Sequence, residues 1–129
     1  MIEKMFELAV NARKNSYSPY SNFAVGACVL TEKGNMYAGC NVENAILHGI
    51  CAEQNAITTM VANGERKIKE ILVVGDGNTL VTPCGLCRQV IREFGDNDTL
   101  IHVAGSDGVK KTFKLSELLP QSFGPETLK

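Results

Sequence analysis

The feature that most restricts the fold of this 129-residue chain is Ile68–Val74, an apolar run rich in β-branched residues. Such a run is typical of a buried central strand. It lies between two segments with helical spacing, Ala52–Asn63 and Gly85–Phe94, and glycines at 64 and 95 are placed to end each helix. Alternation of helices with a buried strand favours an α/β fold.

Further elements are expected on both sides of this central unit. The apolar spacing within residues 2–13 indicates an amphipathic first helix. We therefore predict a single domain spanning residues 1–129, a three-layer α/β/α sandwich around a mixed five-stranded sheet. The other expected elements are a loop at Ser16–Asn22, strands at Phe23–Leu30, Met36–Val42, Thr99–Ala104 and Lys111–Lys114, and a helical turn capped by Ser116.

The composition limits which kinds of molecule this protein is expected to bind. Hydrophobic residues make up 44% and charged residues 21% of the chain, and the net charge of −1 argues against a nucleic-acid partner. No apolar run approaches the roughly 20 residues of a membrane helix, and Met1–Val10 lacks the apolar core of a signal peptide. Five cysteines, an odd number, do not indicate a disulfide framework. We expect a cytoplasmic protein with no membrane partner and with reduced thiols available to a metal.

Two segments carry side chains suited to metal chemistry, Cys51-Ala52-Glu53 and Pro83-Cys84-Gly85-Leu86-Cys87. Alone, the C-x-x-C pair is compatible with a redox pair, half of a structural zinc site or two ordinary thiols. Cys51 offers a third thiolate, and a hydrolytic zinc ion keeps three protein ligands and leaves its fourth position to water. The carboxylate of Glu53 follows two residues after Cys51.

All three of these cysteines are expected at helix starts. Unpaired backbone N–H groups and the helix dipole favour the thiolate there over the thiol. Because Cys84 and Cys87 are three residues apart in a first helical turn, both can face one ion. Glu53, in the first turn of its own helix, can reach toward the open position of the metal. Taken alone, Glu53 would be interpreted as a solvated acid that the dipole favours.

Together the two segments match the zinc-deaminase signature of Cys-x-Glu followed by Pro-Cys-x-x-Cys. The chain resembles the cytidine deaminases of the short, three-cysteine zinc type over nearly its whole length. The blocks that carry the resemblance are Ser18-Pro19-Tyr20-Ser21-Asn22-Phe23, Val25-Gly26-Ala27, Asn41-Val42-Glu43-Asn44-Ala45, Cys51-Ala52-Glu53, Pro83-Cys84-Gly85, Cys87-Arg88-Gln89 and Leu118-Leu119-Pro120.

The resemblance implies hydrolytic deamination of cytidine or deoxycytidine in pyrimidine salvage, with release of ammonia. It implies that Cys51, Cys84 and Cys87 hold one Zn²⁺ per chain, which lowers the pKa of a water ligand toward neutrality. Glu53 is then expected to take a proton from this water, deliver it to ring N3 and help to protonate the departing amine.

The resemblance also implies contacts with a small nucleoside substrate. Asn41 and Glu43, two apart at a predicted strand end, are expected to bind the ribose, and Phe23 to pack against the base. Without the zinc motifs, the first two would be interpreted as a polar strand end and Phe23 as core. The other implied contacts are Ala52, the backbone carbonyl of Thr82 near the leaving amine, and Phe123, which neighbouring subunits of a homotetramer lend to one another's active sites.

The chain departs from the family pattern at two places. The stretch Asn44–Ile50 is one residue shorter than usual and lacks a tyrosine, and Gln54 stands where three-cysteine members usually carry arginine. That arginine offsets the charge of the thiolate cluster, so we expect Arg88 to be the main charge partner of the cysteines, with help from Gln54 and from His48 if protonated.

Two alternative functions are weighed against this prediction. One is a deaminase of a modified cytosine nucleoside such as blasticidin S, which Asn41 and Glu43 disfavour. The other is a non-catalytic zinc-bearing interaction module, for which Glu53 would be superfluous. The choice between cytidine and deoxycytidine is not readable from the residues. Cys28 and Cys40 are expected to act as small buried apolar residues, and His102 to be structural.

Overall fold

The computed structural model describes all 129 residues and contains one mixed sheet of five strands. The strands lie in the order β2-β1-β3-β4-β5, and β3 and β4 are parallel while the other pairs are antiparallel. Their bounds are β1 Gly26–Thr31, β2 Met36–Cys40, β3 Ile68–Val74, β4 Leu100–Gly105 and β5 Gly108–Lys114. The predicted mixed five-stranded sheet is therefore confirmed.

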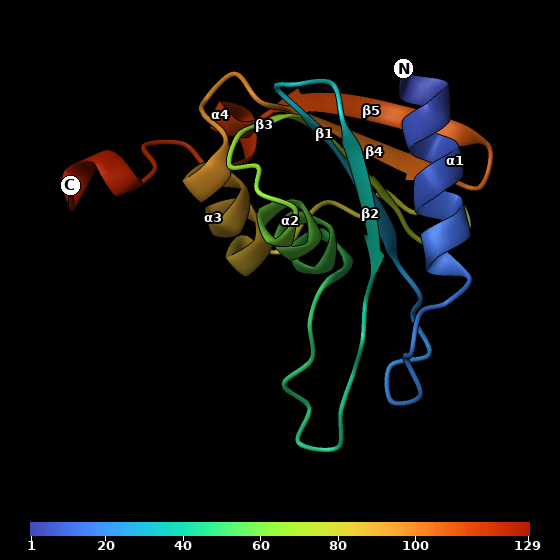
Figure 1. Ribbon diagram of the computed structural model, residues 1–129. Coiled ribbons are helices and arrows are strands. Elements are labelled where there is room, and N and C mark those ends of the chain that lie inside the picture. The colour runs from blue at the N-terminus through green and yellow to red at the C-terminus, as the bar shows by residue number, and fades with distance from the viewer.

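Helices cover both faces of this sheet. Figure 1 shows α1 (Ile2–Arg13) on one side and α2 (Ala52–Ala62) and α3 (Gly85–Phe94) on the other. The short helix α4 (Leu115–Leu118) and a 3-10 turn, Pro125–Thr127, follow near the carboxyl-terminal end. This arrangement confirms the predicted three-layer α/β/α sandwich. No helix is long and apolar enough to cross a membrane.

The central strand β3 explains why the sheet has two separate cores. Its side chains alternate: Ile71 and Val73 point to one face of the sheet, and Leu72 and Val74 point to the other. Ile71 joins the core beneath α2 and α3, and Leu72 and Val74 join the core beneath α1. All four are buried, which is what a continuous apolar stretch predicts for a strand covered on both faces.

Two glycines allow the helices to approach the hairpin of β1 and β2 closely. A Cβ atom at Gly26 would lie 2.0 Å from the carbonyl oxygen of Ala9 in α1. A Cβ atom at Gly39 would lie 2.5 Å from the backbone nitrogen of Ala56 in α2. A side chain at either position would collide with the helix backbone, so each strand needs glycine where it contacts its helix most closely.

Several predicted boundaries are wrong. The second strand ends at Cys40 rather than Val42. The first strand begins at Gly26 rather than Phe23. The segment before Gly26 is bound by the side chain of Asn41 instead of by a neighbouring strand. This side chain accepts a hydrogen bond from the Val25 N–H (2.8 Å) and donates one to the Phe23 carbonyl (2.8 Å). The last strand begins at Gly108, not Lys111. Ser116 lies inside α4, whose first turn is closed instead by Glu117, which accepts from the backbone N–H of Lys114 (2.8 Å).

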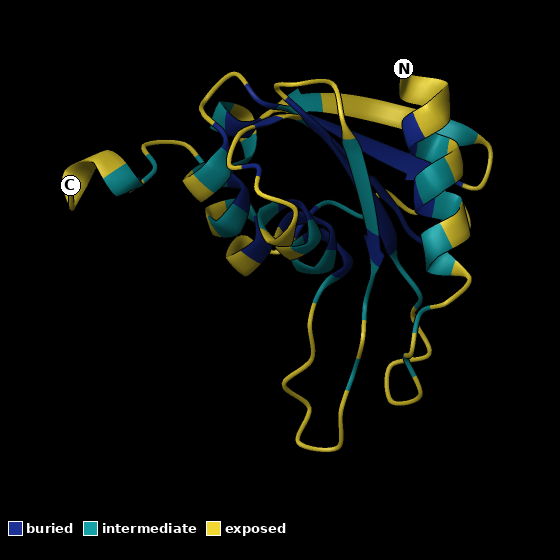
Figure 2. Cartoon of the chain, in the orientation of Figure 1, coloured by how far each residue is buried: buried dark blue, intermediate teal, exposed yellow.

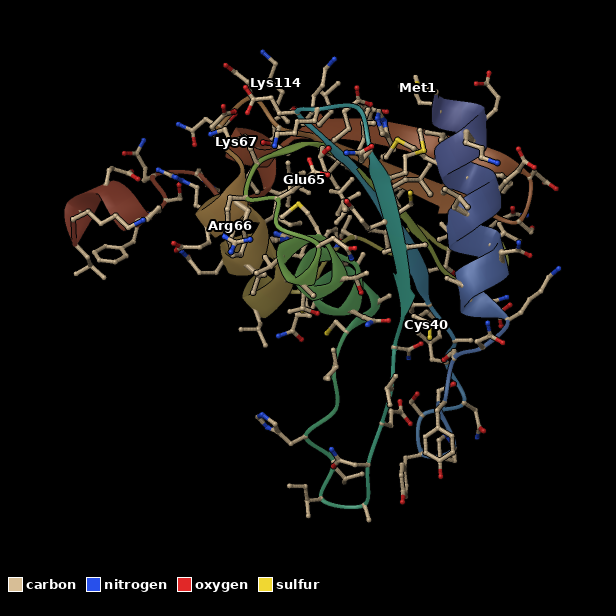
Figure 3. The ribbon with its side chains drawn as sticks, in the orientation of Figure 1. Met1, Cys40, Glu65, Arg66, Lys67 and Lys114 are labelled. Carbon is tan, nitrogen blue, oxygen red and sulfur yellow. The ribbon has the colours of Figure 1, made fainter.

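Cys28 and His102 behave as the sequence predicts, and Cys40 is less buried than predicted. Cys28 is buried, and burial raises the pKa of its thiol to about 12, whereas Cys40, at the lower end of β2 in Figure 3, is only half-buried. His102 is buried between two partners, with Nε2 2.7 Å from Glu70 Oε1 and Nδ1 2.8 Å from Thr112 Oγ1. These bonds support the interpretation of His102 as structural.

Two loops extend from the same end of the sheet. One connects β2 to α2, and the other connects α1 to β1; both lie at the bottom of Figure 1 and are largely exposed in Figure 2. The β2–α2 loop is a narrow hairpin, in which Val42 and Ile50 exchange backbone hydrogen bonds of 3.0 and 2.8 Å. Because α2 begins where this loop ends, the loop stands next to the cysteine motifs.

Candidate metal centre and active site

The two cysteine motifs meet where α2 and α3 begin. Cys51 and Cys84 occupy the N-cap positions of the two helices, and Cys87 lies in the first turn of α3. The three Sγ atoms all lie within 4.8 Å of one another, with Cys51 and Cys84 3.9 Å apart. The sequence prediction that these three thiols converge is therefore confirmed.

This donor set fits a zinc ion. Two sulfurs bound at Zn–S lengths of about 2.3 Å in a tetrahedron are separated by about 3.8 Å, close to the spacing of Cys51 and Cys84. Three thiols are soft ligands that suit zinc, and they leave one tetrahedral position without a protein ligand. The cluster can therefore hold a metal ion of the hydrolytic kind.

The cysteines already share protons unequally. A hydrogen bond from Cys87 lowers the pKa of the Cys51 thiol to about 6. The same contact, together with burial, raises the pKa of Cys87. The lowered pKa favours the thiolate at Cys51, and the protons of the remaining thiols must leave when a metal binds.

Glu53 stands beside the cluster in the first turn of α2. Only 5% of its surface is exposed, and this burial raises the pKa of its carboxyl to about 7, with a further contribution from the nearby charge of Cys51. The interpretation of Glu53 as a solvated acid is therefore wrong. A buried carboxyl next to a metal-binding cluster is suited to holding and releasing a proton.

Gln54 caps the helix that carries Cys51 and Glu53. Its Oε1 accepts the backbone N–H of Cys51 (3.1 Å), while the Cys51 side chain faces the backbone N–H of Gln54, as in a capping box. The amide oxygen thus fixes the backbone at the first metal-binding residue.

Arg88 makes a different set of contacts from those expected. Its guanidinium donates to the carbonyls of Pro83 (2.7 Å) and Leu118 (2.8 Å) and to the hydroxyl of Thr82 (3.2 Å). None of these hydrogen bonds goes to a cysteine sulfur, and the expected role of Arg88 as charge partner of the cluster stays a prediction. Arg88 instead braces the segment before Cys84 against the end of α4, because these carbonyls lie within reach of its planar fork.

A pocket of about 460 Å³ opens beside the cluster, between the two loops at the end of the sheet. Glu43 is held at this pocket by the loop before β1: its Oε1 accepts from the backbone N–H groups of Tyr20 (3.0 Å) and Ser21 (3.1 Å), and the Ser21 hydroxyl donates to Oε2. These bonds lower the pKa of the Glu43 carboxyl, with the Ser21 hydroxyl as the largest cause. The lining residues are Tyr20, Ser21, Asn41, Glu43, Leu47, Gly49, Ile50 and Cys51.

Some of the residues that the sequence predicts at the substrate site line this pocket, and others do not. Asn41 and Glu43 both line it, as their spacing predicts, and Cys51 joins them to the metal-binding cluster. The side chain of Asn41 already binds Ser16, Phe23 and Val25, so its polar atoms brace the loop. Leu47 and Ile50 also line the pocket, and no signal in the sequence pointed to either of them.

The other expected contacts lie outside the lining of this pocket. Phe23 is part-exposed, and Ala52 is buried at the start of α2. Thr82 precedes the second motif and accepts from Arg88. Phe123 is 56% exposed on the carboxyl-terminal segment, where its carbonyl accepts from Gln89 of α3 (2.8 Å).

Comparison with known proteins identifies this architecture. The pattern described as the cytidine and deoxycytidylate deaminase zinc-binding region matches residues 1–103. The chain belongs to this family. It is 39% identical over 128 residues to a cytidine deaminase of Sporosarcina psychrophila, a match that spans 98% of this chain and 94% of the relative. It is 40% identical over 132 residues to a probable cytidine deaminase of Dictyostelium discoideum, covering 98% of this chain and 86% of that protein.

The fold of this family member agrees with a solved structure. A crystal structure of cytidine deaminase from Burkholderia pseudomallei superposes with a TM-score of 0.89 at 37% sequence identity. The match covers 95% of this chain and 99% of the other. The family resemblance inferred from the cysteine motifs therefore extends to the whole sheet and its helices.

Proposed function

We propose that residues 1–129 form one catalytic domain that hydrolyses the exocyclic amine of cytidine and deoxycytidine and releases ammonia. The observation that carries this function is the meeting of three cysteine sulfurs within 4.8 Å, beside a buried Glu53 and at the edge of a pocket. Membership of the cytidine and deoxycytidylate deaminase family supports it.

Each group at the site has a role that its surroundings suit. Cys51, Cys84 and Cys87 hold Zn²⁺, which when bound supplies a Lewis acid that lowers the pKa of a water ligand. Glu53 accepts a proton from the attacking water and delivers it to ring N3 of the base. It then takes the proton of the hydroxyl group added at C4 and passes it to the departing amine, so that a C4 carbonyl forms and ammonia leaves. The backbone carbonyl of Thr82 is proposed to lie near that amine.

The pocket supplies the substrate contacts. The carboxylate of Glu43 is oriented by Tyr20 and Ser21, so it can accept a hydrogen bond from the sugar 3′-hydroxyl. Asn41, which lines the pocket beside Glu43, is proposed to contact the sugar as well. Phe23 and Ala52 are proposed to contact the base. Remote sugar contacts of this kind position the reacting ring, so free cytosine is expected to be a poor substrate.

The active form is proposed to be a cytoplasmic homotetramer. Phe123 is exposed and lies outside the lining of its own pocket, which supports its contribution to the site of a neighbouring subunit. The exposed apolar residues of the β2–α2 loop support burial between subunits. Three thiols must stay reduced to bind the metal, which supports a reducing compartment.

The proposed function is tested by mixing zinc-loaded protein with cytidine, deoxycytidine and cytosine and following the fall in cytosine absorbance. Both nucleosides should be deaminated and free cytosine should not. Glu53→Gln should retain zinc and the fold but lose activity by about 10²–10⁴-fold or more, which is the usual range for a general acid–base group. If the wild-type protein deaminates neither cytidine nor deoxycytidine, the proposed function is contradicted.

A further inference from the structure

Asn55 joins the helix that carries Cys51 to the strand that leads into the pocket. It lies in α2, one turn after Cys51, and its backbone N–H donates to the Cys51 carbonyl (3.0 Å). Its side chain reaches out of the helix, and its Oδ1 accepts from the backbone N–H of Cys40, the last residue of β2 (2.9 Å). Figure 3 labels Cys40 where this strand ends and the β2–α2 loop begins. One side chain thus connects the two parts of the candidate site.

The N–H of Cys40 needs this acceptor because β2 is an edge strand. Its only neighbour in the sheet is β1. The next N–H along the chain, that of Asn41, donates toward the β1 side, to the carbonyl of Val25 (3.2 Å). Because successive N–H groups of an extended chain point in opposite directions, that of Cys40 points to the open edge. The oxygen of Asn55 therefore takes the place of a further strand, one residue before Asn41.

The backbones of β2 and α2 lie in direct contact around this hydrogen bond. A Cβ atom at Gly39 would lie 2.8 Å from both Cβ and Oδ1 of Asn55, so glycine is what allows this side chain to reach Cys40. The end of β2 cannot shift along α2 while the bond remains. The spacing between Glu53 of the helix and Glu43 of the following loop is therefore fixed here.

We propose that Asn55 is a positioning residue that sets where Glu43 stands relative to Glu53 and the cysteine cluster. This inference rests on the proposed function, in which Glu43 binds the sugar 3′-hydroxyl and Glu53 carries the proton. Glu43 lies only three residues after Cys40, so a shift of the strand end moves its carboxylate. A remote sugar contact positions the reacting ring, and a small displacement of that contact weakens both binding and turnover.

The test removes the acceptor and measures the sugar contact by itself. Asn55→Ala has no side-chain acceptor, and alanine favours the helix more than asparagine does, which helps to keep the fold. Asn55→Gln misplaces the oxygen and is the second variant should Asn55→Ala not fold, whereas Asn55→Asp keeps an oxygen in place. Asn63→Ala is the matched control, because Asn63 ends the same helix and its side chain donates within it, to the Thr59 carbonyl (2.8 Å).

The readouts are the Kd values of the zinc-loaded protein for uridine and for 3′-deoxyuridine, neither of which can be deaminated, measured by calorimetry. Their ratio reports the contact with the 3′-hydroxyl. The wild type should bind uridine more tightly. Asn55→Ala should raise the uridine Kd by about tenfold and leave the 3′-deoxyuridine Kd nearly unchanged, because a misplaced carboxylate loses a charge-assisted hydrogen bond. The kcat/KM for cytidine should fall by a similar factor with zinc content unchanged, and Asn55→Asp and Asn63→Ala should keep the wild-type ratio.

Several outcomes would overturn the inference. An equal rise in both Kd values would show that Asn55 only supports the fold of the pocket, and an unchanged ratio or a loss of zinc that accounts for the weaker binding would exclude the role as well. Equal affinity of the wild type for the two ligands would leave no 3′-hydroxyl contact to be positioned. A wild type that prefers uridine but does not deaminate cytidine would instead contradict the proposed function, and the two Kd values would still decide the role of Asn55.

Discussion

Gln54 shows how one side chain connects helix capping to metal binding. Its amide oxygen accepts the N–H of Cys51, the residue that both begins α2 and offers the first sulfur to the metal. The family usually carries arginine here, so the expected consequence of glutamine was a loss of positive charge. The observed contact is a cap that orients Cys51, while the hydrogen bonds of Arg88 go to Pro83, Leu118 and Thr82.

Removal of this cap should weaken zinc binding through the protein backbone. Gln54→Ala should lower the free energy of unfolding of the zinc-free protein by about 1 kcal/mol, as lost N-caps commonly do, and should lower zinc affinity in competition with a chelator. Gln54→Glu keeps an acceptor oxygen and should retain the stability of the zinc-free protein. Weaker zinc binding by Gln54→Ala with unchanged stability of the zinc-free protein would argue against capping.

Glu65 links two elements that are distant in the sequence. It follows α2 and is buried, and its Oε2 accepts from Asn35 Nδ2 and Tyr37 Oη, both at 2.8 Å, in the hairpin of β1 and β2. Figure 3 labels Glu65 where the chain leaves α2. These bonds and one from the Thr31 hydroxyl, the largest cause, lower the pKa of the Glu65 carboxyl.

The lowered pKa of Glu65 predicts a pH-dependent contribution to stability. A carboxyl whose pKa is lower in the folded state stabilises the protein above its unfolded pKa of about 4.3, and this contribution is lost as the pH falls through the folded value. Glu65→Gln should therefore lower the urea midpoint of the zinc-free protein at pH 7, and the difference from the wild type should shrink below about pH 4.3. Glu32→Gln, an exposed substitution in the same hairpin turn, should have little effect. A difference that is constant with pH would contradict the role of the ionised carboxylate.

The elements themselves could be predicted because their signals are local. The alternation of Ile68–Val74 with helical periodicities on either side gives the sheet and its layers, and the cysteine spacing gives the metal-binding cluster. The start of β1 could not be predicted, because it depends on the side chain of Asn41, which is brought there by tertiary folding. The partners of Arg88 and Glu65 were missed for the same reason: hydrogen bonds between distant segments leave no periodic pattern in the sequence.

At the scale of the whole molecule, α3 connects the metal-binding cluster to the carboxyl-terminal segment. Its first residues carry Cys84 and Cys87, and Arg92 further along donates to Ser122 Oγ (2.9 Å) and pairs with Glu126. A Cβ atom at Gly124 would lie 2.4 Å from the Arg92 guanidinium, so a larger residue there would require this side chain to shift. The segment that bears Phe123 is thus fixed to the helix that positions two sulfurs, and Figure 1 shows it extending away from the sheet beyond α3.

This arrangement predicts complementation between two impaired variants. Phe123→Ala should lower kcat/KM for cytidine because the site loses an aromatic contact, and Glu53→Gln should be nearly inactive because it lacks the proton carrier. When the two chains are co-expressed, an intact site arises wherever the Glu53 of a Phe123→Ala chain meets the Phe123 of a Glu53→Gln neighbour. Random assembly gives roughly a quarter of the sites this composition, so the mixture should be much more active than either variant alone. Activity no higher than the mean of the two separate variants would show that Phe123 serves its own chain or none.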